Sequence, residues 1–461
     1  MIEEGKIIDL CERFGQRHII EHLTGLSQEE RYILMQNLSR IDFPFLHSLY
    51  SELKAKKKRL FNSSEIEPPQ VVPYPTSKEQ LEMHDRAKKL GESLLCERKV
   101  ACLLVAGGQA TRMGISSPKG FLPITPVKKK SFFQIFCEKI LAISKRYDTE
   151  IPLLLMTNPE SKKDIEEFFE RQRFFGLKNE NVIIFEQSTL PVLTEEGKII
   201  LKDRTEILLS PNGHGDSIKR IHDLGILEML TDRGYEYLFY FQVDNPLVKI
   251  ADPVFLGYHV IHGADVSLKV VRKRDEDEKV GLYVKVSGKH RIIEYSDLDP
   301  EISKLRDENG DLIYWAGNTA MHVFSLAFLK RINSSGLSLP YHLAKKKVFL
   351  EREKKEVDVL KFETFVFDSL FWTERTCALE IKREEEFSPV KNRVGSSSPM
   401  TAQKEMSNLF KKWLRMCGVE VAEEAYVEIS PLFALDMEEC VEKLKGKKMI
   451  IKEDTYIGEE E

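Results

Sequence analysis

Short apolar runs that alternate with amphipathic segments dominate the pattern of this chain. Runs that are apolar at nearly every position are typical of strands buried on both faces of a sheet. The segments between them repeat apolar side chains every three or four positions, as helices do. The predicted strands are residues 100–105, 151–156, 182–185 and 237–243, and the predicted helices are residues 131–147, 161–172 and 216–232. This alternation predicts an α/β fold, a doubly wound sheet with helices on both faces.

The N-terminal part has a different pattern. Residues 7–58 show helical periodicity, with Ser27 and Glu30 spaced as a capping box. Prolines recur too often in residues 67–75 for a helix, which predicts an extended linker. A helix from about residue 77 to 95, closing at or shortly after Gly91, then leads into the first strand.

The C-terminal half adds shorter elements. Three further strands are spaced as an antiparallel extension of the sheet, which makes the sheet mixed. They are expected at residues 264–271, 281–286 and 291–293, and a helix is expected at residues 401–416. We therefore expect three regions: a helical N-terminal region and linker, a main domain, and a small C-terminal α+β domain. Their expected bounds are 1–75, 76–383 and 384–461.

Composition narrows the class of protein. The 461 residues are 42% hydrophobic and 31% charged with a net charge of −5, as in a globular protein without a nucleic-acid or membrane partner. No apolar run is long enough to span a bilayer and the first residues do not resemble a signal peptide, so a cytoplasmic location is expected. The 7 cysteines stand singly without a CxxC pair, which predicts reduced thiols and no structural zinc.

The glycine-rich stretch after the first strand is the strongest candidate for a binding site. Gly107 and Gly108 allow backbone N–H groups to approach an anion, and Arg112 and Lys119 add two positive charges. Neither a Walker loop nor a dinucleotide fingerprint fits, because Lys119 is followed by glycine and the glycine spacing is wrong. The stretch predicts a phosphate-binding loop, and a plain turn between strand and helix is the alternative.

Three other positions are weaker candidates. Asp244 follows the strand at residues 237–243, where ligands bind in open α/β sheets, and could hold Mg²⁺ or simply cap a turn. The turn around Gly213 could lie against a flat base. Lys391, in a loop after several acids, reads by itself as a solvated side chain. His259 and His262 lack a third ligand, so no metal site is expected there.

The motifs together resemble those of the UDP-sugar pyrophosphorylases, and most closely the eukaryotic-type UDP-N-acetylhexosamine pyrophosphorylases. The glycine stretch is similar to the family's signature at every fixed position. Further similar segments extend the resemblance from residue 15 to residue 392. The signature positions are Gly107, Gly108, Thr111, Arg112, Gly114, Pro118, Lys119 and Gly120, and the other similar segments include 185–187, 243–245, 316–318 and 386–392.

The resemblance implies a fold and a reaction. The fold would be the Rossmann-like doubly wound mixed sheet of nucleotide-diphospho-sugar transferases, with residues 76–383 as the catalytic nucleotidyltransferase domain. The reaction would be uridylyl transfer from UTP to a hexose 1-phosphate, with release of pyrophosphate. The substrates would thus be UTP and a sugar 1-phosphate, the cofactor Mg²⁺, and the protein a monomer or weak oligomer.

The resemblance also implies roles for residues around the nucleotide. Gly107 and Gly108 would contact it, while Arg112 and Lys119 would neutralise the UTP phosphates. Lys391 would reach the phosphate from the C-terminal side, so the resemblance favours a catalytic role over a solvated one.

The remaining roles concern the base, the metal and the sugar. Gln187 and Gly213 would read the uracil edge, and Asp244 would hold Mg²⁺. The sugar hydroxyls would be bound by residues from three separate segments, which are Gly281, Glu294 and Asn318.

One loop departs from the closest pattern. His214 stands where N-acetylhexosamine enzymes have asparagine close to the sugar, and the sequence Gly-His-Gly-Asp at residues 213–216 is that of UDP-glucose and broad UDP-sugar pyrophosphorylases. The chain as a whole favours N-acetylglucosamine 1-phosphate, whereas this loop favours glucose 1-phosphate. A catalytically silent sugar-nucleotide sensor is the other alternative, although it predicts loss of charged residues that this chain retains.

Overall fold

The computed structural model of the chain forms two compact units, each assembled from segments distant in sequence. The first unit comprises Met1–Arg59, Gln187–Ile218 and Ser338–Asp368, and the second comprises Leu60–Glu186, Lys219–Leu337 and Ser369–Glu461. The three-domain division expected from the sequence stays a prediction. The structure describes residues 4–55, 61, 64–108, 114, 117–350, 354–447 and 449–459.

A ten-stranded mixed sheet forms the centre of the second unit. Strand β2 (Val100–Val105) pairs in parallel with β3 (Leu153–Thr157) and β7 (Tyr237–Gln242), and β3 pairs in parallel with β4 (Val182–Glu186). Strand β11 (Ala316–Ser325) pairs antiparallel with β7 and continues the sheet. The predicted doubly wound mixed sheet is therefore confirmed. The other strands are β1 (Ile66–Glu67), β8 (Val266–Arg272), β9 (Leu282–Val286), β10 (Lys289–Ile293) and β14 (Thr376–Glu380).

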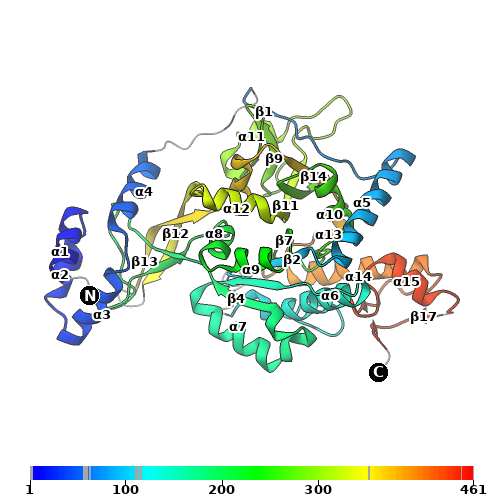
Figure 1. Cartoon of the computed structure of the whole chain (residues 1–461), viewed down its shortest axis with the longest axis horizontal. Coiled ribbons are helices and arrows are strands. Elements are labelled where there is room, and N and C mark those ends of the chain that lie inside the picture. Colours follow the sequence, from blue (N-terminus) through cyan, green and yellow to red (C-terminus); the bar gives the residue numbers. More distant parts are fainter. Residues whose placement is uncertain are drawn as a thin grey trace. The chain divides into compact units, whose positions relative to one another are not determined.

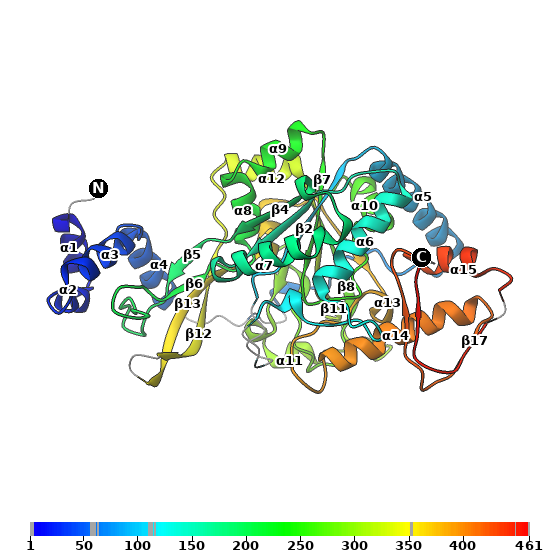
Figure 2. The same cartoon turned by 90° about the horizontal axis from the view of Figure 1, so that it is seen from below.

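Helices cover this sheet through aromatic contacts. Figure 2 shows α6 and α7 along strands β2 and β4. Phe136 of α6 packs edge-on against Phe241 of β7, with ring centroids 5.3 Å apart. The predicted helix at residues 216–232 is interrupted at Gly225, the N-cap of its second half. The helices of this part are α5 (Lys78–Cys96), α6 (Phe132–Arg146), α7 (Pro159–Arg171), α8 (Asp216–Asp223), α9 (Ile226–Asp232), α10 (Pro253–Ile261), α11 (Pro300–Ser303), α12 (Leu326–Ser334) and α13 (Arg383–Glu386).

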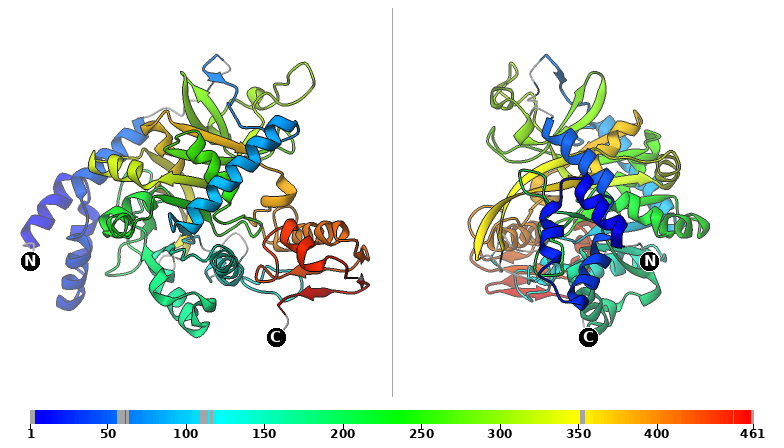
Figure 3. Two further views of the ribbon diagram at one scale, coloured as in Figure 1. Left: turned by 45° about the vertical axis from the view of Figure 1, so that its right-hand side comes forward. Right: turned by 90° about the vertical axis from the view of Figure 1, so that its left-hand side faces the viewer.

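The first unit joins four helices to a long two-stranded sheet. The expected capping box is confirmed, because Ser27 and Glu30 exchange hydrogen bonds at the start of α3. Strands β12 and β13 pair antiparallel along their whole length, and Figure 3 shows them beside the N-terminal helices. The elements are α1 (Glu4–Arg13), α2 (Arg17–Leu23), α3 (Gln28–Leu38), α4 (Phe43–Ala55), β5 (Thr189–Pro191), β6 (Leu209–Pro211), β12 (Tyr341–Leu350) and β13 (Lys355–Thr364).

The C-terminal part of the second unit has its own apolar core. Helix α14 packs on the short strands through Phe410, Trp413 and Leu414. Lys130, in the loop before α6, donates hydrogen bonds to Glu138 of α6 and to the Tyr456 hydroxyl of β18. These bonds connect the loop to the C-terminal part. The elements are α14 (Pro399–Met416), α15 (Met437–Leu444), β15 (Glu420–Val421), β16 (Val427–Ile429), β17 (Ile450–Ile451) and β18 (Thr455–Ile457).

Helices α5 and α10 cross unusually closely, and they lie side by side in Figure 1. A methyl group at Gly91 would lie 1.8 Å from the carbonyl oxygen of Pro253, and one at Gly257 would lie 1.8 Å from that of Ala87. The helix expected at about residues 77–95 is therefore confirmed. Gly91 lies inside it rather than at its end, and allows the backbones of two helices to touch.

Gly91→Ala is expected to lower the free energy of unfolding by about 1–3 kcal/mol, because the added methyl group meets backbone that cannot rotate away. Gly5→Ala in α1 is the matched control, since nothing lies within 4 Å of its added methyl group. That change should be neutral or stabilise by up to about 1 kcal/mol. Calorimetric melting of both variants tests the packing, and equal melting temperatures would contradict it.

Candidate active site

The glycine loop and Asp244 lie at the same edge of the sheet. In the parallel pairing of β2 and β7, Val105 is opposite Gln242, and the Val243 amide donates to the Val105 carbonyl at 3.1 Å. Gly107 and Asp244 each follow two residues beyond this pair. The carboxyl ends of two neighbouring parallel strands thus present backbone amides and a carboxylate side by side, where α/β sheets bind ligands.

A third strand end fixes the position of the glycine loop. Asn158, which follows β3, donates from Nδ2 to the carbonyl oxygen of Gly107 at 2.9 Å. Its Oδ1 accepts the amide of Ser161 at 2.7 Å and so caps α7. Asn158 therefore ties the loop to the start of a helix. In the sequence, the one visible signal of this unpredicted residue is an asparagine before proline at the end of an apolar strand.

A segment from the C-terminal side, residues 386–391, crosses the same edge. The amide of Val390 donates to the backbone carbonyl of Asp244 at 2.8 Å. The ammonium group of Lys119 donates to the carbonyl of Val390 at 2.9 Å. Val390 thereby joins the metal candidate and the phosphate-binding candidate, and neither Val390 nor its bonds could be found by motif spacing.

Asn245 clamps this segment against the end of β7. Its Nδ2 donates to the carbonyl of Glu386 at 2.7 Å, and its Oδ1 accepts the amide of Ser388 at 3.0 Å. Asn245 is only 3% exposed, so both halves of its amide are satisfied by this segment. The sequence placed Asn245 in a motif without giving it a task.

A buried charge cluster anchors the beginning of the segment. The ammonium group of Lys269, which has no exposed surface, donates to Asp252 at 2.6 Å and to Glu386 at 2.5 Å. Breaking one member would leave an unpaired buried charge, so the cluster holds residue 386 firmly.

The side chain of Lys391, another predicted catalytic cation, is less constrained than that of Lys119. Lys391 has an exposed side chain, while its backbone amide donates to the carbonyl of Ser397 at 2.7 Å. Its catalytic role stays a prediction. Arg112 lies outside the described residues.

The structure brings the three predicted sugar ligands together. The amide of Asn318 donates to the carbonyl of Gly281 at 2.8 Å. A methyl group at Gly281 would lie 3.2 Å from Oε1 of Glu294, which places that carboxylate beside the same backbone. The pairing of β11 with β8 shifts register between Asn318 and His322, and such bulges turn side chains toward a site.

The predicted uracil ligands lie in the first unit, in one cluster of loops. The amide of Asn212 donates to the backbone carbonyl of Ser188, the residue after Gln187, at 2.9 Å. A methyl group at Gly213 would lie 2.4 Å from the carbonyl oxygen of Thr364, so only glycine lets this loop pack on β13. Gln187 and Gly213 are therefore on adjacent backbone, and their contact with a base stays a prediction.

His214 is held as a neutral imidazole in the same cluster. Its Nδ1 accepts the Val366 amide at 3.1 Å, and its ring stacks on Phe365 with centroids 5.3 Å apart. Burial, and then the neighbouring His342, lower the pKa of His214 to about 4. With Nδ1 occupied as an acceptor, the proton of the neutral ring is on Nε2, which is a single fixed donor.

Both ring nitrogens of His259 are engaged by neighbouring hydroxyl groups. His259 donates or accepts at Ser267 and Ser325 through its two nitrogens, at 2.7 and 2.9 Å, and burial lowers its pKa to about 3. Within the described ranges, no three histidine, cysteine, aspartate or glutamate side chains are grouped to hold a metal ion.

Among the residues that the structure describes, no helix is both long enough and apolar enough to cross a membrane.

Comparison with known proteins yields consistent matches over nearly the full length. The family model described as UTP–glucose-1-phosphate uridylyltransferase matches residues 43–445. The UDP-N-acetylglucosamine pyrophosphorylase of Saccharomyces cerevisiae is 34% identical over 94% of this chain and 95% of its own. The UDP-N-acetylhexosamine pyrophosphorylase-like protein 1 of Homo sapiens is 32% identical over 98% of each chain. A solved structure, the uridine diphosphate N-acetylglucosamine pyrophosphorylase of Trypanosoma brucei, matches with a TM-score of 0.82 at 26% identity, over 98% of this chain and 99% of that chain.

Proposed function

Because the chain belongs to the UTP–glucose-1-phosphate uridylyltransferase family, we propose that it makes UDP-N-acetylglucosamine and pyrophosphate from UTP and N-acetylglucosamine 1-phosphate. The observation that carries this proposal is the edge where Gly107, Lys119 and Asp244 meet, linked through Val390. The names and near-complete coverage of the relatives support the N-acetylated sugar.

The reaction needs positioning rather than a covalent nucleophile. The phosphate oxygen of the sugar 1-phosphate attacks the α-phosphorus of UTP in line, and pyrophosphate leaves. Two anions must be held together, so fixed positive charge and inward-facing amides are the protein's contribution. In this proposal Lys119, Lys391 and Arg112 supply the charge, and Gly107 and Gly108 the amides.

Asp244 is suited to be the one carboxylate through which the protein binds Mg²⁺. Mg²⁺ usually binds through one or two carboxylates with phosphate oxygens and water, rather than in an all-protein cage. Asp244 is partly exposed at the strand end, and no ion pair among the described side chains engages its carboxylate. The ion would neutralise charge on the phosphates when bound, and Asp244 would hold it beside the glycine loop.

For the sugar, we propose that Gly281, Glu294 and Asn318 bind hydroxyl groups. The role of His214 in the first unit stays the one that the resemblance implies, and its available donor is Nε2. A single neutral donor at residue 214 can serve an acetamido oxygen or a hydroxyl, as the amide of asparagine could. The histidine therefore need not exclude the N-acetylated substrate. The Gly-His-Gly-Asp loop nevertheless makes UDP-glucose synthesis the second candidate function.

Turnover of the two sugar 1-phosphates with UTP separates these candidates. We expect kcat/KM for N-acetylglucosamine 1-phosphate to exceed that for glucose 1-phosphate by at least about tenfold, a ratio that one pocket contact can supply. Pyrophosphate release measures both. A preference for glucose 1-phosphate would assign the second function, and binding of UDP-sugar without any release would indicate a sensor.

A further inference from the structure

A cavity of about 260 Å³ lies in the second unit, and its lining includes the residues that follow Asn245, and also Asp252 of the buried charge cluster. It is enclosed by α5, α6, α14, the start of α15 and the loop that follows Asn245. Since about 10–15 Å³ of such space suffices for one water molecule, the cavity has room for a ligand of at least about nine heavy atoms.

One wall of the cavity is apolar. It is formed mainly by one face of α14, where Phe410 and Trp413 meet edge-on with ring centroids 5.5 Å apart. Such a wall favours an apolar ligand body. The apolar lining includes Ile135, Leu247, Met406, Leu409, Phe410 and Trp413.

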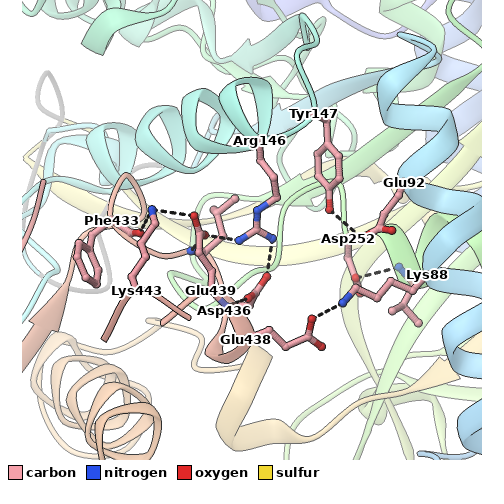
Figure 4. Close-up of polar contacts among 12 residues, drawn as sticks. Lys88, Glu92, Arg146, Tyr147, Asp252, Phe433, Asp436, Glu438, Glu439 and Lys443 are labelled. Atoms are coloured by element: carbon pink, nitrogen blue, oxygen red, sulfur yellow. Dashed lines mark hydrogen bonds and ion pairs between the residues drawn. The ribbon is translucent and has the colours of Figure 1, made fainter. Parts of the chain in front are cut away.

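The rest of the lining includes charged residues, and most of its cations are already neutralised by carboxylates. The acidic lining residues are Asp85, Asp252, Glu385, Asp436 and Glu438. Figure 4 shows Arg146 held by Asp436, and Lys88 held by Glu438, each at 2.5 Å. These ion pairs connect α6 and α5 to the start of α15. Because Arg146 and Lys88 already have carboxylate partners, an anionic ligand would gain little by binding to them.

Lys139 is the exception. Its ammonium nitrogen donates to the backbone carbonyls of Pro246 at 2.7 Å and Val248 at 2.8 Å. The other described lysine and arginine side chains of the lining each form an ion pair with a carboxylate, and Lys249 does so with Glu386. Among these described side chains, Lys139 alone forms none. Burial lowers the pKa of Lys139 to about 7. The negative charge of Glu386 raises this pKa, but by less than burial lowers it. Two carbonyls satisfy two N–H groups and leave one bonding position on the nitrogen.

We propose that this cavity binds a small amphipathic carboxylate, with its apolar body against α14 and its carboxylate on the Lys139 nitrogen. A carboxylate would give the Lys139 ammonium group a direct ion-pair partner, in a charge-assisted hydrogen bond. The site goes beyond the proposed function, and its test needs no turnover.

Heptanoate and heptan-1-ol are matched probes, since they share the alkyl chain and differ in the charged group. By calorimetric titration of the whole chain, heptanoate should bind saturably and at least about tenfold more tightly than heptan-1-ol. Equal affinity of the two probes, or no saturable binding of heptanoate at millimolar concentration, would overturn the proposal.

Lys139→Met should reduce heptanoate binding to the level of the alcohol. Because this variant leaves two carbonyls without a donor, Leu409→Trp provides a second variant that fills the apolar wall and keeps Lys139. It should abolish heptanoate binding, whereas Met400→Trp, at an exposed position of the same helix, should leave it unchanged. Heptanoate binding retained in both cavity variants would also overturn the proposal.

Discussion

Replacing Lys119 with alanine is expected to lower kcat by about 10²-fold or more, which is the effect of removing one preorganised stabilising donor. The ammonium group is fixed by its bond to the Val390 carbonyl, beside the glycine loop. A charge held there meets phosphate without first being oriented, so its loss should affect the transition state more than substrate binding. Single-turnover rates with saturating UTP measure the effect.

Two further variants separate charge from structure. Lys119→Arg retains a positive charge and should recover part of the rate, although a guanidinium cannot reproduce the ammonium geometry fully. Lys346→Ala, at an exposed position of β12, should match the unaltered enzyme. Unchanged turnover of Lys119→Ala would refute the assignment, as would a loss explained wholly by a lower melting temperature.

The sheet was predictable because its strands carry their own signal. Strands β2, β3 and β7 are apolar at nearly every position, and only strands covered on both faces remain so. The β12–β13 pair was not predicted, because the three consecutive exposed lysines Lys345, Lys346 and Lys347 look like solvated surface. Residues 351–353 between these strands lie outside the described part.

The candidate site was predictable only where chemistry and spacing coincide. Gly107 and Asp244 follow strand ends in sequence, and Lys119 belongs to the glycine-rich stretch after β2, so local reasoning could find them. Asn158 and Asn245 act by binding backbone from another segment, and Asn245 reaches residues more than 140 positions away. Such partners are set by the tertiary fold, and an asparagine by itself suggests no more than a turn.

The same limit applies to charged residues. Lys130 belongs to a run of three lysines, yet its side chain is only 11% exposed and pairs with Glu138. Gly91 looked like a helix end, yet α5 continues through it to Cys96. In both cases a partner that decides the meaning of the local pattern is distant in sequence, Tyr456 for Lys130 and Pro253 for Gly91.

Asp244→Asn is expected to lower kcat/KM by about 10²-fold at low Mg²⁺, and raising the Mg²⁺ concentration should restore part of the activity. The change keeps the size of the side chain but removes the charge that a hard cation requires. Losing a group that only supports a ligand already costs 10- to 100-fold in many metal sites, so losing the ligand should cost at least as much. Initial rates over a range of Mg²⁺ concentrations measure the shift.

Asp223→Asn is the matched control, because Asp223 is a carboxylate on α8 paired with Lys219 at the surface. Its Mg²⁺ dependence should equal that of the unaltered enzyme. The backbone carbonyl of Asp244 still accepts the Val390 amide in Asp244→Asn, so the crossing segment and Lys119 should stay in place. A fall in activity that does not depend on Mg²⁺ would therefore assign Asp244 to substrate binding rather than to the metal, and an unaltered rate would remove it from the site.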